Sequence, residues 1–248
     1  METLEPEPHP RLSTITFDVG GTLLSPDPSV GAVYAEVFAR HGVAAGAREI
    51  EAAFQRAWKT VAGETGGPTD EANEIGKWRR LVNATLRDLP QPRHFDSLFE
   101  ELWHTFSEPR RWRLREHTRE VLCELRERGI QLAVLSNWDS RLRPLLKGFG
   151  LIRYFETLFI SAEIGWEKPD LRIFRAVEDT LSVKPSEILH LGDCPHSDAA
   201  PARAAGWRSL LIRDETGTNG VTGPEITDLR ELLMLVTGNT NPRPPDPR

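Results

Sequence analysis

Apolar residues follow two different spacings along the 248-residue chain. Residues 14–17 (TITF) form a short β-prone run that ends at Asp18, and Gly20 and Gly21 then require a sharp turn of the backbone. From about residue 29 to residue 107 the apolar positions recur at helical spacing, which predicts four amphipathic helices. Their apolar faces carry Tyr34, Val37 and Phe38, then Ile50, Phe54, Trp58 and Val61, then Trp78, Leu81, Val82 and Leu86, and finally Phe95, Leu98, Leu102 and Phe106.

After about residue 113 the pattern alternates between strand and helix. We expect strands at 131–135, 157–160, 188–191 and 209–212, and helices at 117–128, 171–180 and 199–205. This alternation predicts an α/β fold, a Rossmann-like parallel sheet with helices on both faces. The four-helix segment is then an insertion that follows the first strand.

Polar residues stand at the carboxyl ends of three predicted strands, where open α/β sheets bind their ligands. These residues are Asp18, Ser136 and Asp193, and Lys168 follows in a loop that leads into a helix. Magnesium typically binds one or two carboxylates together with substrate phosphate oxygens and waters. Lysine and hydroxyl donors stabilise the charge of a phosphoryl group in transfer. The pattern alone therefore favours phosphoryl chemistry at this edge of the sheet.

Composition narrows the classes of partner. The formal net charge is −6, so the chain as a whole has no electrostatic attraction to nucleic acid or to an anionic membrane. The two cysteines form neither a disulfide framework nor a CxxC zinc pair. The proline-rich N-terminal segment lacks the apolar run of a secretory signal, and no stretch reaches the ~18 apolar residues of a membrane span. We expect a soluble, cytoplasmic protein.

Four segments, in order, resemble the four motifs of the haloacid dehalogenase (HAD) superfamily. They are FDVGGTL (17–23), VLSN (134–137), EKPD (167–170) and LGDCPHSD (191–198). The resemblance implies a subfamily I member in which residues 12–27 and 112–236 form the catalytic core. It identifies residues 28–111 as a helical C1 cap over the site. Residues 1–11 and 237–248 are expected to be flexible tails.

By this resemblance Asp18 is a nucleophile that forms a covalent aspartyl intermediate. Lys168 neutralises both this nucleophile and the transferring group. Ser136 and the backbone around Asn137 hold phosphoryl oxygens. Thr22 braces the turn after the nucleophile and is counted with these phosphate-binding residues.

The resemblance also implies a Mg²⁺ cofactor. Its ligands would be the carboxylates of Asp18 and Asp193 and the backbone carbonyl of Gly20, and Asp198 would orient a metal-bound water or Lys168 from behind. An N-cap role for Asp198 is the structural alternative. The expected substrate is a small phosphorylated metabolite.

One position departs from the superfamily pattern. HAD phosphatases usually carry a second aspartate two residues after the nucleophile, which protonates the leaving oxygen, and here that position is Gly20. His196 or Asp139 could supply the proton instead. The substrate could also carry a leaving group that needs no proton, as acyl phosphates and carbon–halogen bonds do. A third alternative is a non-catalytic scaffold.

The fourth motif distinguishes a phosphatase from a dehalogenase. Hydrolytic dehalogenases of the superfamily lack its magnesium carboxylate, whereas Asp193 is present, so we favour a magnesium-dependent phosphatase. Trp138 and Trp166, beside motif residues, are candidates to line the site. The arginines between residues 110 and 115 are expected to form a solvated hinge, with substrate attraction as the alternative.

Overall fold

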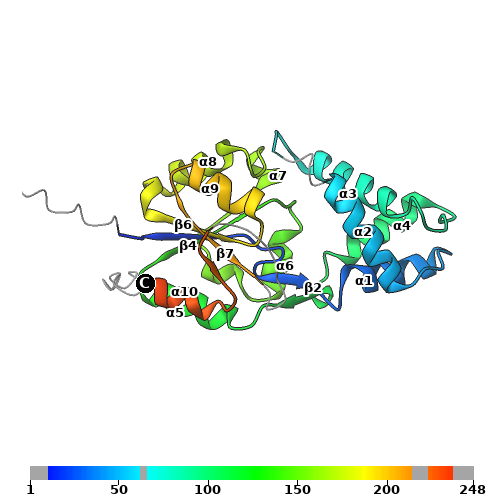
Figure 1. Ribbon diagram of the computed structural model, residues 1–248, viewed down its shortest axis with the longest axis horizontal. Coiled ribbons are helices and arrows are strands. Elements are labelled where there is room, and N and C mark those ends of the chain that lie inside the picture. The colour runs from blue at the N-terminus through cyan, green and yellow to red at the C-terminus, as the bar shows by residue number, and fades with distance from the viewer. Residues whose placement is uncertain (1–10, 62–65, 214–222, 237–248) are drawn as a thin grey trace, which may run out of the picture.

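A computed structural model describes residues 11–61, 66–213 and 223–236 of the chain (Figure 1). Apart from Arg11, the two predicted tails lie outside these residues. The described part forms a core around a parallel sheet and, to one side of it, a bundle of four helices. The predicted α/β fold with a helical insertion is confirmed.

The core sheet has six parallel strands in the order β5-β4-β1-β6-β7-β8 among the described residues. Strand β1 lies between β4 and β6, so the ends of these three strands are neighbours. Phe17, the last residue of β1, pairs with Val134 on one side and with Leu191 on the other. The strands span Thr14–Phe17 (β1), Gln131–Ser136 (β4), Thr157–Ile160 (β5), Ile188–Gly192 (β6), Arg208–Ile212 (β7) and Glu225–Ile226 (β8).

Helices cover both faces of this sheet (Figure 1). Leu132 and Val134 of β4 pack into one hydrophobic cluster, and the alternate residues Ala133 and Leu135 pack into another, as the twofold period of a strand requires. The first cluster includes side chains of α5 (Thr118–Glu127), α6 (Leu142–Gly148) and α10 (Arg230–Leu235). The second is completed by α8 (Leu171–Leu181) and α9 (Ala200–Ala204), with α7 (Ser161–Ile164) beside them.

The helical bundle has a hydrophobic cluster of its own. Its helices are α1 (Val30–Arg40), α2 (Ala47–Val61), α3 (Glu71–Thr85) and α4 (Phe95–Thr105), close to the four that the helical spacing predicts. The bundle joins the core through two strands that the sequence did not predict, β2 (Leu24–Pro26) and β3 (Trp112–Leu114), paired antiparallel. Each has only three residues, too few to show a period.

Further contacts hold the bundle against the core, among them the three that follow. Pro68 forms an antiparallel bridge with Trp166, beside Lys168 in sequence. The Ser140 amide donates to Glu71 of α3 at 2.7 Å. The guanidinium of Arg141 lies 3.2 Å from the ring centroid of Trp103 on α4. These contacts seat the bundle beside the loops that follow β4 and β5.

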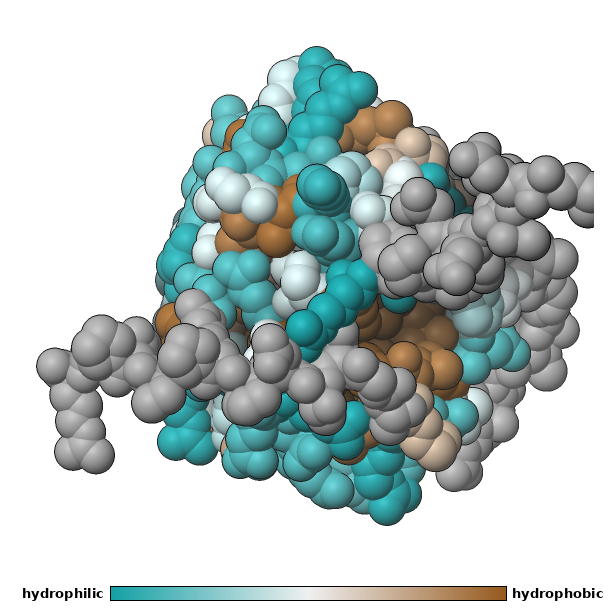
Figure 2. All heavy atoms as spheres, turned by 90° about the vertical axis from the view of Figure 1, so that its left-hand side faces the viewer, coloured by the Kyte–Doolittle hydropathy of each residue, from teal (hydrophilic) through white to brown (hydrophobic). Residues whose placement is uncertain are grey.

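The end of the core away from the bundle is seen in Figure 2. Hydrophilic residues dominate its described surface, with smaller apolar areas between them. Among the larger exposed apolar side chains are Met234 and Leu235 of α10. In the described ranges we find no helix with the length and apolarity that crossing a membrane requires.

Candidate active site

The carboxyl end of β1 places Asp18 at the centre of a hydrogen-bonded group. Ser136 Oγ, from the end of β4, donates to Asp18 Oδ1 at 2.9 Å, and Lys168 Nζ donates to the same oxygen at 3.0 Å. Thr22 Oγ1 donates to Asp18 Oδ2 at 3.3 Å. Four residues from three of the motif segments thus meet at one carboxylate, which is itself buried.

Lys168 is buried, and its three ammonium protons all have acceptors. Besides Asp18, Nζ donates to Asp198 Oδ1 at 2.5 Å and to the carbonyl oxygen of Leu135 at 3.0 Å. The backbone of Lys168 is held as well, because its N–H donates to Asn137 Oδ1 (2.7 Å) and its carbonyl accepts from Asn137 Nδ2 (2.8 Å). The side chain of Asn137 therefore fixes the backbone of the lysine.

Burial and neighbouring charges shift the pKa values of Lys168, Asp18 and Asp198 in opposite directions. Burial by itself would lower the pKa of Lys168, but the carboxylates of Asp18 and Asp198 outweigh it and raise that pKa. Burial raises the pKa of Asp18 despite the nearby lysine. For Asp198 burial is outweighed by Lys168 and His190, and its pKa is lowered. The raised pKa of Lys168 and the lowered pKa of Asp198 favour an ammonium–carboxylate pair between these two groups.

A third carboxylate, Asp193, follows the end of β6. Oxygens of Asp18, Asp193 and Asp198 all lie within 4.8 Å of one another. Within the described residues no ion pair is found for Asp193. Burial, and next the charge of Asp18, raise the pKa of Asp193 to about 8. With all three ionised, one ammonium leaves two negative charges in excess, which suits a divalent cation.

The turn after Asp18 brings the backbone of Gly21 close to the side chain of Asp193. Gly21 has a φ of +77°, and a Cβ there would collide with the Asp193 carboxylate, so this position needs glycine. Arg115 donates to the carbonyl oxygens of Gly21 (2.7 Å) and Thr22 (2.6 Å). Among the arginines expected to form a solvated hinge, Arg115 instead braces this turn, a role that its sequence neighbourhood does not reveal.

Gly20 faces the ring of Trp138. A Cβ on Gly20 would lie 3.3 Å from Trp138 Cζ3, and Gly20 is not among the glycines with positive φ. Trp138 is half-buried and packs on Trp112, with ring centroids 5.2 Å apart. An aromatic side chain therefore borders the position where the superfamily's acid would stand.

Neither candidate for a substitute acid is well placed. Asp139 is fully buried, and both of its carboxylate oxygens accept from Arg141 at 2.7 Å. His196 is exposed to solvent, and the described part of the chain offers it no contact with the three aspartates. The group that most directly faces Gly20, Trp138, has no acidic proton to give.

The sequence analysis did not single out two buried residues near the site, Thr16 and His190. His190 on β6 lies 3.2 Å from Asp198 through Nε2 and 2.9 Å from Thr16 Oγ1 through Nδ1. Burial lowers the pKa of His190, in spite of Asp198, so the imidazole is neutral at pH 7. Asp198 itself accepts from the Cys194 amide at 2.9 Å within a π-helical turn (Pro195–Ala199) and does not cap α9.

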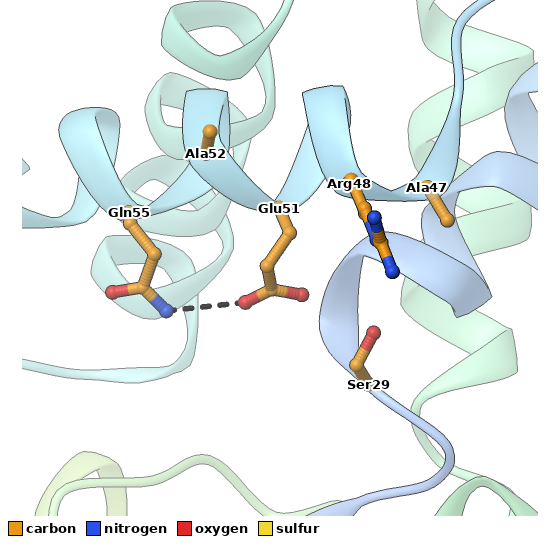
Figure 3. Close-up of a pocket in the computed structure, with 6 residues that line it drawn as sticks. All are labelled: Ser29, Ala47, Arg48, Glu51, Ala52 and Gln55. Carbon is orange, nitrogen blue, oxygen red and sulfur yellow. Dashed lines mark hydrogen bonds between the residues drawn. The ribbon is translucent and has the colours of Figure 1, made fainter.

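The remaining candidate features make other contacts. The guanidinium of Arg172 lies over the ring of Trp166, 3.2 Å from its centroid, and the backbone of Trp166 pairs with that of Pro68. A shallow hollow of about 310 Å³ lies on the bundle, and its lining includes no residue of the acid cluster. Figure 3 shows it beside α2, where Gln55 donates to Glu51 and Arg48 points toward Ser29.

Comparison with known proteins identifies the family. The model of the haloacid dehalogenase-like hydrolases matches residues 12–206, and the chain belongs to this family. A relative from Bos taurus, haloacid dehalogenase-like hydrolase domain-containing protein 3, is 33% identical over 206 residues, which are 82% of each chain. The predicted membership of the HAD superfamily is thereby confirmed, and the chain is a hydrolase of that superfamily.

Two further likenesses are more limited. A phosphoserine phosphatase of Thermus thermophilus is 37% identical over 133 residues, 52% of this chain and 53% of the relative. A HAD hydrolase of Bacillus subtilis, solved bound to magnesium, superposes with a TM-score of 0.74 at 18% identity, covering 92% of this chain and all of that one. This second likeness establishes the fold alone.

Proposed function

We propose that the protein is a magnesium-dependent phosphatase that acts on a small phosphorylated metabolite through an aspartyl-phosphate at Asp18. The observation that carries this proposal is the shared hydrogen bonding of Asp18 and Asp198 to buried Lys168, with Asp193 beside them. The family is one of hydrolases, and its phosphoserine phosphatase relative supports phosphate as the group transferred.

In this proposal each side chain has one task. Asp18 attacks phosphorus with the carboxylate oxygen that is not held by Ser136 and Lys168, while Lys168 offsets the charge gathered on the carboxylate and phosphoryl group. Ser136 and the backbone at residue 137 receive phosphoryl oxygens, and Thr22 holds the far carboxylate oxygen until attack. The helical bundle, residues 28–111, serves as a cap that excludes water.

The acid cluster suits a hard divalent cation. Its excess negative charge and oxygen-only donors match what Mg²⁺ prefers, and Asp193 is the carboxylate of the cluster that makes no ion pair among the described residues. We assign Asp18, Asp193 and the carbonyl of Gly20 as ligands. Bound there, Mg²⁺ would supply charge stabilisation to the phosphoryl oxygens.

The proposal is tested with p-nitrophenyl phosphate, whose leaving group departs without a proton. We expect release of p-nitrophenolate in Mg²⁺ and none in EDTA. Asp193→Asn should need far more Mg²⁺ for the same rate. Turnover in EDTA, or halide release from 2-haloacids in place of phosphate release, would contradict the assignment.

The glycine at position 20 predicts a strong dependence on the leaving group. General acid help is typically worth ~10²–10⁴ in rate, so alkyl phosphates should react at least about 100-fold more slowly than p-nitrophenyl phosphate. Gly20→Asp should raise the alkyl phosphate rate by about 10-fold or more, provided that Trp138 yields a few tenths of an ångström. Steady-state kcat/KM on both substrates measures this.

Gly20→Asn is the matched control, because it adds the same volume without an acidic proton. It should leave the alkyl phosphate rate low. Equal rates of the wild-type protein on the two esters would refute the missing-acid argument, as would an equal gain in Gly20→Asn.

The pKa of Asp193 predicts how pH changes the effect of Mg²⁺. Because that pKa is raised to about 8 from an ordinary 3.8, the folded metal-free protein keeps a proton there that the unfolded chain loses. Asp193 therefore lowers stability as pH rises from about 4 to about 8. Saturating Mg²⁺ should raise Tm by about 5 °C at pH 8 and by less at pH 5.5, where protons compete for the carboxylate.

Thermal unfolding at both pH values, in Mg²⁺ and in EDTA, gives the two shifts. In Asp193→Asn the shift should be small at either pH. A shift of equal size at pH 5.5 and pH 8 in the wild-type protein would contradict the role of Asp193.

A further inference from the structure

Buried hydrogen bonds run from β1 through β6 to the candidate nucleophile. Thr16 and His190 are partners in the parallel register of these strands, and Thr16 Oγ1 lies 2.9 Å from His190 Nδ1. His190 Nε2 lies 3.2 Å from Asp198 Oδ1, the oxygen that also accepts from Lys168, which in turn donates to Asp18. All five side chains are buried.

The chemistry of these groups determines which atom donates and which accepts in each hydrogen bond of this series. An ionised carboxylate can only accept, so His190 must carry its proton on Nε2 to bond with Asp198. On a neutral ring Nδ1 is then an acceptor, and the hydroxyl of Thr16 is the donor that it faces. Asp198 thus selects the tautomer, and the hydroxyl of Thr16, which can donate or accept, supports it by donating to Nδ1.

We propose that His190 is a positioning residue for Lys168, with its Nε2–H tautomer set by Asp198 and supported by a hydrogen bond from Thr16 to Nδ1. Held by His190 and by the Cys194 amide, Asp198 keeps the orientation from which it binds the lysine. The inference rests on the proposed roles of Asp18 and Lys168. His190 acts through Asp198 and contacts neither substrate nor nucleophile.

The opposite tautomer would undo this arrangement. It would point the lone pair of Nε2 at a carboxylate oxygen 3.2 Å away, inside the protein, where repulsion between acceptors is not screened by water. Asp198 would then turn away, and Lys168 would lose one of its three acceptors. The ammonium would no longer be held against Asp18.

Thr16→Val tests the proposal with a side chain of nearly the same volume. Loss of the hydroxyl should lower kcat for p-nitrophenyl phosphate by about tenfold, the effect of one hydrogen bond, with KM unchanged. Thr16→Ser should keep the wild-type kcat. The matched control is Thr14→Val, equally buried on the same strand but bonded to Gln131, which should also leave kcat unchanged.

A second measurement does not depend on activity. The ¹⁵N chemical shifts of His190 in the metal-free protein should report a neutral ring protonated on Nε2, and Thr16→Val should shift the Nδ1 resonance, because that nitrogen loses its donor. A ring protonated on Nδ1 alone in the wild-type protein would overturn the proposal. So would a kcat in Thr16→Val that matches that of Thr14→Val.

These readouts separate the inference from the proposed function. A wild-type protein with no phosphatase activity but with the Nε2–H tautomer would reject the proposed function and leave the hydrogen-bond chain supported. An active wild-type protein whose kcat is unaffected by Thr16→Val would reject the positioning role alone.

Discussion

Asp18→Asn should abolish turnover of p-nitrophenyl phosphate, with a fall in kcat of more than about 10⁴-fold. Removal of a catalytic nucleophile has effects of this size or larger, because no other group can form the covalent intermediate. Asparagine keeps the volume of the side chain and an oxygen for Ser136, so the fold should be retained. Initial rates and the far-ultraviolet circular dichroism of the variant measure the two effects.

The covalent step has its own readout and control. Acid-quenched wild-type protein should carry a phosphoryl group on the peptide that contains Asp18, and Asp18→Asn should carry none. Asp170→Asn is the comparison, because Asp170 lies in the motif segment of Lys168 but caps α8 and pairs with Arg172. It should keep wild-type kcat. A phosphoryl group on another residue would reject Asp18 as nucleophile.

Lys168→Met should destabilise the protein by about 3–5 kcal/mol, the usual consequence of leaving a buried charge without its partner. Asp18 and Asp198 both accept a hydrogen bond from this one ammonium, which balances their negative charge, and both are buried. The variant should also lose activity on p-nitrophenyl phosphate. Urea unfolding in EDTA gives the change in the free energy of unfolding.

Two further variants decide whether charge is the cause. Lys147→Met removes an exposed lysine and should change stability by less than about 0.5 kcal/mol. Lys168→Met combined with Asp198→Asn should be more stable than Lys168→Met alone, because one unpaired carboxylate is then gone. If the double variant is no more stable, loss of packing outweighs loss of the ion pair.

The missing acid gives the site its most distinctive feature. Gly20 leaves a backbone carbonyl for a cation, while the half-buried ring of Trp138 occupies the side on which a longer side chain would extend. Asp139 is already paired with Arg141. If the proposed function holds, we expect a preference for substrates whose leaving groups are stable anions, such as acyl phosphates.

The sequence by itself determined the fold and the principal residues of the candidate site. A strand of β-prone residues that ends at Asp18 is a local signal, as are the apolar helical faces that became α1 to α4. Strand ends of a parallel sheet converge on one edge whatever the loops do. Asp18, Ser136 and Asp193 could therefore be placed together from their positions after three strands.

Only the tertiary structure decided which partner each side chain takes. The register of β1 against β6 sets Thr16 beside His190, the fold turns Asn137 onto the backbone of Lys168, and Arg115 reaches the turn after the nucleophile. These partners are far apart in the chain, and no local period records them. Their contacts depend on how strands, loops and bundle pack, because a hydrogen bond is set by distances of a few tenths of an ångström.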